Sequence, residues 1–253
     1  MMLERIEHES GIRELRLTRP PVNALNPELV HALQAAVQAA PGDGARGLVI
    51  AGSSGIFSAG LDVPFLLTLG RDAMRAFWQE FFALCGALSR SPIPIAAAIT
   101  GHSPAGGAVL ALFCDYRVMA RGAYRIGLNE VQVGLTVPDC IQAGLRRLIG
   151  SHRAERLLVQ GTMLDADAAL AIGMVDELAD VDFVGARAIG WLGELLKLPR
   201  QAMLSTRAMA RAELAALFAE PSSLPVEDFL DAWFAPEAQN TLRAMVERLK
   251  AKR

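Results

Sequence analysis

Two glycine-containing segments stand out because their main-chain groups could bind an oxygen that carries negative charge. The first is Phe57–Asp62, which reads Phe-Ser-Ala-Gly-Leu-Asp, and the second is Gly101–Gly107, which reads Gly-His-Ser-Pro-Ala-Gly-Gly. Glycine permits unusual backbone angles and lets a ligand approach the main chain closely. Two amide N–H groups that converge from such turns form an oxyanion hole, and a helix N-terminus behind the second turn would strengthen it. Each turn by itself is a common connection between a strand and a helix.

Both turns lie between a predicted buried strand and a predicted helix. The hydrophobic pattern predicts strands over residues 48–51 and 93–100, and later helices over residues 71–90 and 108–114. Strands alternate with helices to about residue 180, which indicates an α/β protein, and the chain beyond residue 185 is predicted to be helical. The same patterns predict further elements: strands over residues 3–8, 12–17, 116–120 and 124–126, and a helix that begins at Asn26 with Pro27 in its first turn.

The composition describes a folded globular protein that is not built to bind a polyanion. The chain has 253 residues, is 52% hydrophobic, and carries 25 Lys and Arg against 27 Asp and Glu. This composition excludes intrinsic disorder, and the balanced charge predicts no attraction to nucleic acid or to an anionic membrane. A mean hydropathy of +0.29 is high for a monomer and indicates that some apolar surface faces another subunit.

Cysteine usage and the first residues predict a cytoplasmic protein. Cys85, Cys114 and Cys140 are odd in number, widely spaced and without a CxxC motif, which favours a reducing compartment and argues against a zinc site. Glu4 and Glu7 stand where a targeting peptide would exclude acidic residues. The longest apolar stretches are too short to span a bilayer.

The two turns and several further motifs, in the same order, resemble the crotonase (enoyl-CoA hydratase/isomerase) superfamily. The resemblance implies an α/β fold, a crotonase-like spiral of ββα units with a C-terminal helical region. It implies a core with the active site over residues 1–185, and helices over residues 186–253 that cover the core and take part in oligomerisation. It also implies a homotrimer or a dimer of trimers. The segments that carry the resemblance are Pro21–Asn26, Phe57–Asp62, Pro94–Ala120, Arg125–Gly134 and Gly150–Leu178.

Members of this superfamily bind acyl-CoA thioesters, so the resemblance implies an acyl-CoA substrate. The thioester oxygen would lie between the amide N–H groups of Leu61 and Gly106, one from each turn. Coenzyme A is then part of the substrate, and no metal or redox cofactor is implied. By the same correspondence, the CoA moiety would lie along residues of the first two motifs: Asn23, Ala24, Leu25, Ser58, Ala59 and Gly60.

The resemblance also indicates which reaction to expect. Hydratases of the superfamily hold a water between two glutamates, and here Val109 stands in place of the first while Glu130 matches the second. A single carboxylate suits a proton shuttle, and Ile126–Glu130 resembles the mitochondrial-type Δ3,Δ2-enoyl-CoA isomerases of fatty-acid degradation, in which the matching glutamate is the base. Burial of Glu130 in its otherwise apolar stretch would raise its pKa toward neutrality.

Two alternatives stay open at this level. One is another reaction of the superfamily, such as hydration, thioester hydrolysis or a carbon–carbon bond step, with Asp139 or a water as the second group. The other is a CoA-binding or RNA-binding relative without catalysis, although the balanced charge and the few lysines disfavour RNA. The remaining candidates have simpler structural interpretations. Asp62 is interpreted as a helix cap, His102 as a turn or substrate-adjacent residue, and Cys114 as an inert buried thiol. Four apolar residues are interpreted as core residues, some of which could also line an acyl pocket: Met74, Phe77, Trp78 and Phe81.

Overall fold

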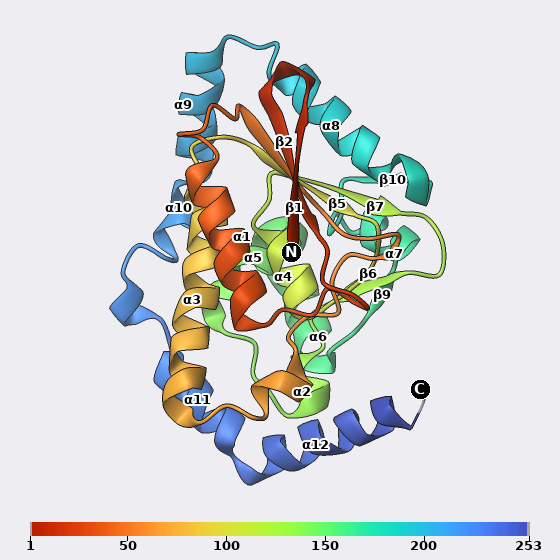
Figure 1. Ribbon diagram of the computed structural model, residues 1–253, viewed down its shortest axis with the longest axis vertical. Helices are drawn as coiled ribbons and strands as arrows, with labels where there is room; N and C mark the ends of the chain where they lie inside the picture. Colours follow the sequence, from red (N-terminus) through yellow and green to blue (C-terminus); the bar gives the residue numbers. More distant parts are fainter. Residues whose placement is uncertain (1, 252–253) are drawn as a thin grey trace.

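The computed structural model describes residues 2–251, and its core is a spiral that builds two β-sheets at once (Figure 1). The larger sheet has six strands in the order β1-β2-β3-β5-β7-β10. The pair β1 and β2 is antiparallel, and every later neighbour in this sheet is parallel, so the later strands are joined by long connections that carry helices. The strand bounds are Leu3–His8, Ile12–Leu17, Gly47–Ala51, Ile95–Ile99, Tyr116–Ala120 and Glu177–Ala179.

The smaller sheet has the order β4-β6-β8-β9 and lies beside the larger one. Each turn of the spiral gives one strand to the larger sheet and the next to the smaller: β3 then β4, β5 then β6, β7 then β8. This alternation confirms the predicted spiral of ββα units. Because β4, β6 and β8 are parallel neighbours, the chain leaves all three at the same edge of the sheet. The strand bounds are Gly55–Ile56, Gly101–Pro104, Arg125–Gly127 and Leu164–Asp165.

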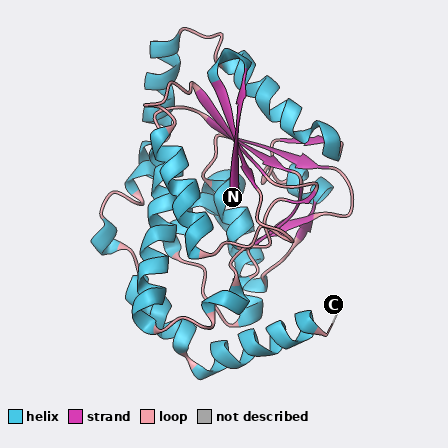
Figure 2. Cartoon of the chain, viewed as in Figure 1, coloured by secondary structure: helices cyan, strands magenta, loops and turns pink. Residues whose placement is uncertain are grey.

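Helices enclose the two sheets on several sides (Figure 2). Helix α4 is buried on all sides, as its apolar sequence predicts, and α1 packs against α3. Helix α8 covers the other face of the larger sheet through Val184, Ala188 and Leu192. Within residues 2–251, no helix has both the length and the apolar character needed to cross a bilayer. The helix bounds are α1 Pro27–Ala39, α2 Val63–Leu66, α3 Arg71–Arg90, α4 Gly106–Leu112, α5 Asp139–Ile149, α6 Ser151–Gln160, α7 Ala166–Ala171, α8 Val184–Leu195, α9 Arg200–Ala210, α10 Ala212–Ala216, α11 Val226–Phe234 and α12 Pro236–Lys250, with short 3-10 helices at Glu9–Gly11 (η1), Glu130–Val133 (η2), Val181–Phe183 (η3) and Pro221–Ser223 (η4).

Several predicted elements are confirmed, and one predicted turn is wrong. The predicted bounds of β1, β2, α3 and β7 are those of the structure, and Asn26 caps α1 by accepting a hydrogen bond from the Leu29 N–H at 3.0 Å. Residues 101–104, predicted as part of a turn, form strand β6, and α4 begins at Gly106 rather than at residue 108. The reason is that Gly101 has no side chain, so β6 can lie directly against Gly55 of β4.

Asp115 ties the C-terminal helices to the core. Its carboxylate forms ion pairs with Arg207 at 2.8 Å and with Arg211 at 3.2 Å, and it accepts a hydrogen bond from the Ile95 N–H at 2.8 Å. These partly and fully buried charges are stabilising only because each has several partners. Since α8 also packs on the larger sheet, the helices after residue 183 are continuous with the core, and the division at residue 185 stays a prediction.

We expect Gly101→Ala to disrupt the pairing of β4 with β6. The new Cβ would lie 2.0 Å from the Gly55 carbonyl carbon, and backbone atoms cannot move away without breaking the sheet. The free energy of unfolding should fall by more than about 4 kcal/mol, the size of the most severe single substitutions. Urea unfolding followed by circular dichroism measures the loss.

Gly190→Ala is the matched control for this substitution. Gly190 lies inside α8 with open space around its Cα, so alanine should stabilise the helix by about 1 kcal/mol. A Gly101→Ala protein as stable as the wild type would contradict the close contact of β4 with β6.

Candidate active site

Three segments leave the same edge of the smaller sheet and surround one cavity. Residues 57–62 follow β4, Ala105 and Gly106 follow β6, and Asn129 and Glu130 follow β8. Residues of all three line a cavity of about 570 Å³. Helix α12 runs across the lower end of the molecule below α2 and adds Met245 to the cavity wall (Figure 1). The spiral therefore places on one cavity wall segments that are about 70 residues apart in sequence.

The backbone of the first turn fixes the direction of the Leu61 N–H. Leu25 and Leu61 form an isolated parallel bridge, in which the Leu25 N–H donates to the Gly60 carbonyl at 2.7 Å and the Asp62 N–H donates to the Leu25 carbonyl at 2.9 Å. Both bonds lie on the side that faces Leu25, and successive N–H groups of an extended chain point to opposite sides. The Leu61 N–H therefore points away from Leu25.

The second turn brings the Gly106 N–H to the same place. Ala105 has a φ of 46°, which is uncommon for a residue with a side chain, and Gly106 begins α4, so its N–H has no partner within the helix. A Cβ on Gly60 would lie 3.1 Å from the Gly106 nitrogen, so the two turns touch. Among residues 2–251, neither the Leu61 nor the Gly106 N–H donates a hydrogen bond, and both are free to bind a ligand oxygen.

Glu130 begins η2 and lines the same cavity. Its Oε2 atom is buried and has no hydrogen-bond partner among the described residues. Burial raises the pKa of Glu130 from 4.5 to about 7, and a hydrogen bond from its own main-chain N–H offsets this rise only in part. A carboxyl group with this pKa is present in both protonation states near neutral pH, so it can accept a proton and return it.

Asp62 is the other acidic residue that lines the cavity, and it is fully engaged. One carboxylate oxygen forms an ion pair with Arg19 at 2.5 Å, and the other accepts a hydrogen bond from the Phe65 N–H at 3.2 Å. The second contact confirms the predicted cap at the start of α2. Because both oxygens of Asp62 already have partners, this carboxylate is not the free base of the cavity.

The other candidates for a second acid or base lie outside the cavity. Asp139 has a side chain that is 81% exposed and forms an ion pair with Arg146 at 2.7 Å. His102 is exposed, and its ring accepts a hydrogen bond from the Arg125 N–H at 3.2 Å. The place on α4 that faces the cavity is taken by Val109, which is buried and has no polar atom to hold a water.

The residues expected along the CoA moiety divide into two groups. Ala24 and Ala59 line the cavity. The other four are buried beside it: Asn23, Leu25, Ser58 and Gly60. Asn23 donates to the Phe57 carbonyl at 3.1 Å, and the Ser58 hydroxyl donates to the Asn23 carbonyl at 2.8 Å. These contacts join the two segments of the site, and direct binding of CoA by these residues stays a prediction.

Part of the cavity wall was not assigned from the sequence. Trp78 and Phe81 are core residues, as predicted, and they also line the cavity; contact with an acyl chain stays a prediction. Phe229 of α11 packs against Trp78 with ring centres 4.4 Å apart, and Met245 and Leu249 of α12 complete the wall. The sequence predicts helices beyond residue 185, but a helical pattern does not show which surface each helix covers.

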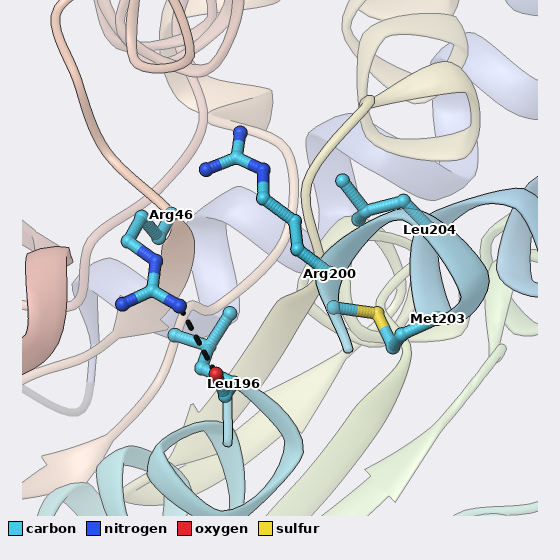
Figure 3. A pocket seen from close by; sticks show the side chains of 5 residues that line it. All are labelled: Arg46, Leu196, Arg200, Met203 and Leu204. Atoms are coloured by element: carbon cyan, nitrogen blue, oxygen red, sulfur yellow. Dashed lines mark hydrogen bonds between the residues drawn. The ribbon is translucent and has the colours of Figure 1, made fainter. Parts of the chain in front are cut away.

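A second hollow, between Arg46 and the start of α9, is too small to hold a ligand. Arg46 closes it by donating a hydrogen bond to the Leu196 carbonyl at 3.0 Å, and Arg200, Met203 and Leu204 fill the remainder (Figure 3). The hydrogen bond thus joins the connection before β3 to the end of α8, and the hollow does not compete with the cavity near Glu130 as a candidate site.

Comparison with known proteins assigns the family. The sequence profile described as enoyl-CoA hydratase/isomerase matches residues 7–252. The chain belongs to the enoyl-CoA hydratase/isomerase family. As a member of this family it is an enzyme, and its α/β spiral with a helical C-terminal region is the crotonase fold.

Relatives of this enoyl-CoA hydratase/isomerase family member have two kinds of name. The mouse protein "Enoyl-CoA delta isomerase 1, mitochondrial" is 33% identical over 255 residues, which cover 100% of this chain and 88% of the mouse protein. A "Probable enoyl-CoA hydratase" from Mycobacterium avium is 34% identical over 202 residues, which cover 79% of this chain and 78% of that protein. The crystal structure of human mitochondrial delta3-delta2-enoyl-CoA isomerase matches with a TM-score of 0.94 at 29% identity, over 100% of both chains.

The raised pKa of Glu130 predicts a pH-dependent loss of stability in this family member. A carboxyl group with a higher pKa in the folded state stabilises the fold below pH 4.5, and this stabilisation is lost as the pH rises through about 7. Relative to Glu130→Gln, the wild type should therefore lose about 3 kcal/mol of unfolding free energy between pH 4 and pH 9. Urea unfolding of both proteins across this range measures the difference.

Glu155→Gln controls for the removal of one carboxylate, because Glu155 lies exposed on α6. A difference between wild type and Glu130→Gln that does not change with pH would contradict the buried environment of Glu130.

Proposed function

We propose that this enzyme converts 3-enoyl-CoA to 2-enoyl-CoA in fatty-acid degradation, with Glu130 as its single proton shuttle. The observation that carries the proposal is a buried carboxylate with a pKa of about 7 and an unpartnered Oε2 atom, in a cavity that two free amide N–H groups also line. The full-length match to proteins named enoyl-CoA isomerases supports the same reaction.

The proton transfer begins at C2 of the bound substrate. The Glu130 carboxylate removes a C2 proton, and the electron pair of that bond moves into the thioester to give a dienolate. The negative charge then rests on the thioester oxygen, which accepts hydrogen bonds from the Leu61 and Gly106 N–H groups. Loss of one such donor costs about 2.7–4 kcal/mol in enzymes that use an oxyanion hole.

The same glutamate completes the reaction. Protonated Glu130 returns its proton at C4, the double bond moves from C3–C4 to C2–C3, and the thioester carbonyl is restored. No other atom is consumed or released, so a single group that binds and releases one proton is sufficient. The pKa of about 7 favours this double role, because neither protonation state is strongly disfavoured.

The same cavity argues against hydration as the main reaction. Addition of water requires a second polar group to hold the water, and Val109 offers none while Asp62 is paired with Arg19. The relatives named as probable hydratases make hydration the specific competing outcome. Purified enzyme should therefore be assayed with 3-enoyl-CoA and 2-enoyl-CoA of several chain lengths, and conjugation and hydration should be followed separately.

Glu130→Gln should lower kcat for isomerisation by about 10²–10⁴-fold, because a positioned acid–base group contributes that much. The substitution keeps the shape of the side chain, so KM should change little. Absorbance of the conjugated thioester measures the rate, and Glu155→Gln on the exposed face of α6 should behave as wild type. Near-wild-type isomerisation by Glu130→Gln, or faster hydration than isomerisation by the wild type, would overturn the proposal.

We propose that the acyl tail lies against the aromatic part of the cavity wall. Trp78, Phe81 and Phe229 line it, and their rings offer a large apolar surface. Phe229→Ala should lengthen the cavity. Burial of one methylene group contributes about 0.8 kcal/mol, so KM should fall by about four-fold for each methylene of the substrate that enters the new space. Steady-state kinetics over a series of chain lengths measures the shift.

Phe218→Ala is the matched control for chain length. Phe218 is as buried as Phe229, packs against Phe113 with ring centres 5.2 Å apart, and does not line the cavity. Both substitutions should destabilise the fold by about 3–5 kcal/mol, but only Phe229→Ala should change the preferred chain length. An unchanged preference in Phe229→Ala would contradict this placement of the tail.

We also propose that the enzyme assembles as a homotrimer or a dimer of trimers in the cytoplasm. Support for assembly comes from exposed apolar side chains in the C-terminal region: Leu198, between α8 and α9, is 52% exposed, and Met209, on α9, is 72% exposed. Support for a reducing compartment comes from three free, buried cysteines. Sedimentation equilibrium separates a monomer from a trimer and a hexamer, and fractionation of the native cells decides the compartment.

A further inference from the structure

We infer that the ion pair between Arg19 and Asp62 is a positioning device for the Leu61 N–H and compensates the negative charge beside it. The inference rests on the proposed function only in that the Leu61 N–H binds the thioester oxygen. Arg19 was not among the residues that the sequence assigned to the site. Both side chains line the cavity and are mostly buried, with Arg19 23% and Asp62 12% exposed.

One guanidinium group joins the two segments that flank the Leu61 N–H. Arg19 Nη2 donates to Asp62 Oδ2 at 2.5 Å, and Arg19 Nη1 donates to the Ala24 carbonyl at 3.0 Å. The guanidinium is planar and rigid, so two bonds from one fork fix the distance between the segments better than a flexible ammonium would. The main chain of Arg19 is held in turn, because its N–H donates to Asn23 Oδ1 at 2.9 Å.

These contacts control the peptide group that carries the Leu61 N–H. Gly60 is held through its carbonyl by the Leu25 N–H at 2.7 Å, and Asp62 is held through its N–H by the Leu25 carbonyl at 2.9 Å. Arg19 reinforces both sides of this bridge, since it binds Ala24 next to Leu25 and Asp62 next to Leu61. Without the pair, the turn would keep the two main-chain bonds to Leu25, the cap to Phe65 and the bond from the Gly60 N–H to Ser58 Oγ, but it would lose its charged partner.

The pair also has an electrostatic role. Asp62 places a carboxylate one residue from an N–H that must stabilise negative charge on the thioester oxygen. In a cavity with a low effective dielectric constant, an uncompensated carboxylate there would oppose that charge. The positive charge of Arg19 offsets this repulsion, and its hydrogen bonds to Asp62 and Ala24 hold the guanidinium in place. Arg19 thus acts through Asp62 and Leu61, and it is a positioning residue.

The test measures both the reaction and the polarisation of the bound carbonyl. Arg19→Gln should lower kcat by about 10–100-fold, less than the 10²–10³-fold loss of a whole oxyanion donor, with KM changed by less than about three-fold. Infrared difference spectra of a bound saturated acyl-CoA, ¹³C-labelled at the thioester carbonyl, should show the C=O stretch move from the wild-type bound value toward that of free acyl-CoA. Arg19→Lys keeps the charge without the fork and should fall between the two proteins in both measurements.

The matched control is Arg146→Gln, which removes an ion pair with Asp139 outside the cavity and should change neither measurement. Wild-type kcat and carbonyl frequency in Arg19→Gln, with only a lower unfolding free energy, would overturn the inference and leave the pair a purely structural one. If Arg19→Gln does not fold, Arg19→Lys decides instead, because it keeps the charge and removes the planar fork. Wild-type values in that variant would likewise overturn the inference.

The outcome is independent of the proton shuttle, because a saturated acyl-CoA undergoes no isomerisation. An Arg19-dependent carbonyl shift in an enzyme that does not isomerise 3-enoyl-CoA would uphold the inference and refute the proposed reaction. If the enzyme isomerises 3-enoyl-CoA but the carbonyl frequency does not depend on Arg19, the proposed reaction is upheld and the inference is refuted. If the C=O stretch of acyl-CoA bound to the wild type equals that of free acyl-CoA, both the proposed oxyanion hole and this inference are wrong.

Discussion

The close contact between successive turns of the spiral is the constraint on which the site depends. Gly101 lies so near Gly55 that a Cβ would overlap the backbone, and Gly60 lies within reach of the Gly106 nitrogen. At both places a side chain would push two turns apart, and the Leu61 and Gly106 N–H groups would no longer share one cavity. Glycine is required here for space, because main chain meets main chain without intervening atoms.

Several polar groups of residues 2–251 that have no hydrogen-bond partner lie beside the cavity. Most buried polar groups in proteins are hydrogen-bonded, and exceptions call for an explanation. Among the described residues, Glu130 Oε2 is one of several buried side-chain atoms without a partner, and it lies beside the same cavity as the two main-chain N–H groups that donate no bond. Ala105 adopts its uncommon backbone angle at the same point. Such groups destabilise the empty protein, and a ligand that supplies one oxygen and one acidic C–H would satisfy them together.

Charge within the cavity is arranged so that one acid is free and the other is not. Among residues 2–251, none forms an ion pair with Glu130, and burial alone raises its pKa. Asp62 lies in a similarly closed region but is held by Arg19 and by the start of α2. Two carboxylates of the same chain therefore differ because their neighbours differ: Asp62 anchors a turn, and Glu130 is the proposed proton carrier.

The sequence by itself determined six of the ten strands within residues 2–251 (β1, β2, β3, β5, β7 and β8), the α/β class and the cap at Asn26, because periodicity and turn chemistry are local properties. It also contains the motifs that mark Leu61, Gly106 and Glu130. It misjudged β6, since a glycine that permits a turn equally permits two strands to touch, and only the position of Gly55 distinguishes these cases. The tertiary structure alone decided that Asp139 faces solvent and that α11 and α12 close the cavity. It also alone paired Arg19 with Asp62, because contacts between distant segments depend on how the spiral stacks and leave no local pattern in the chain.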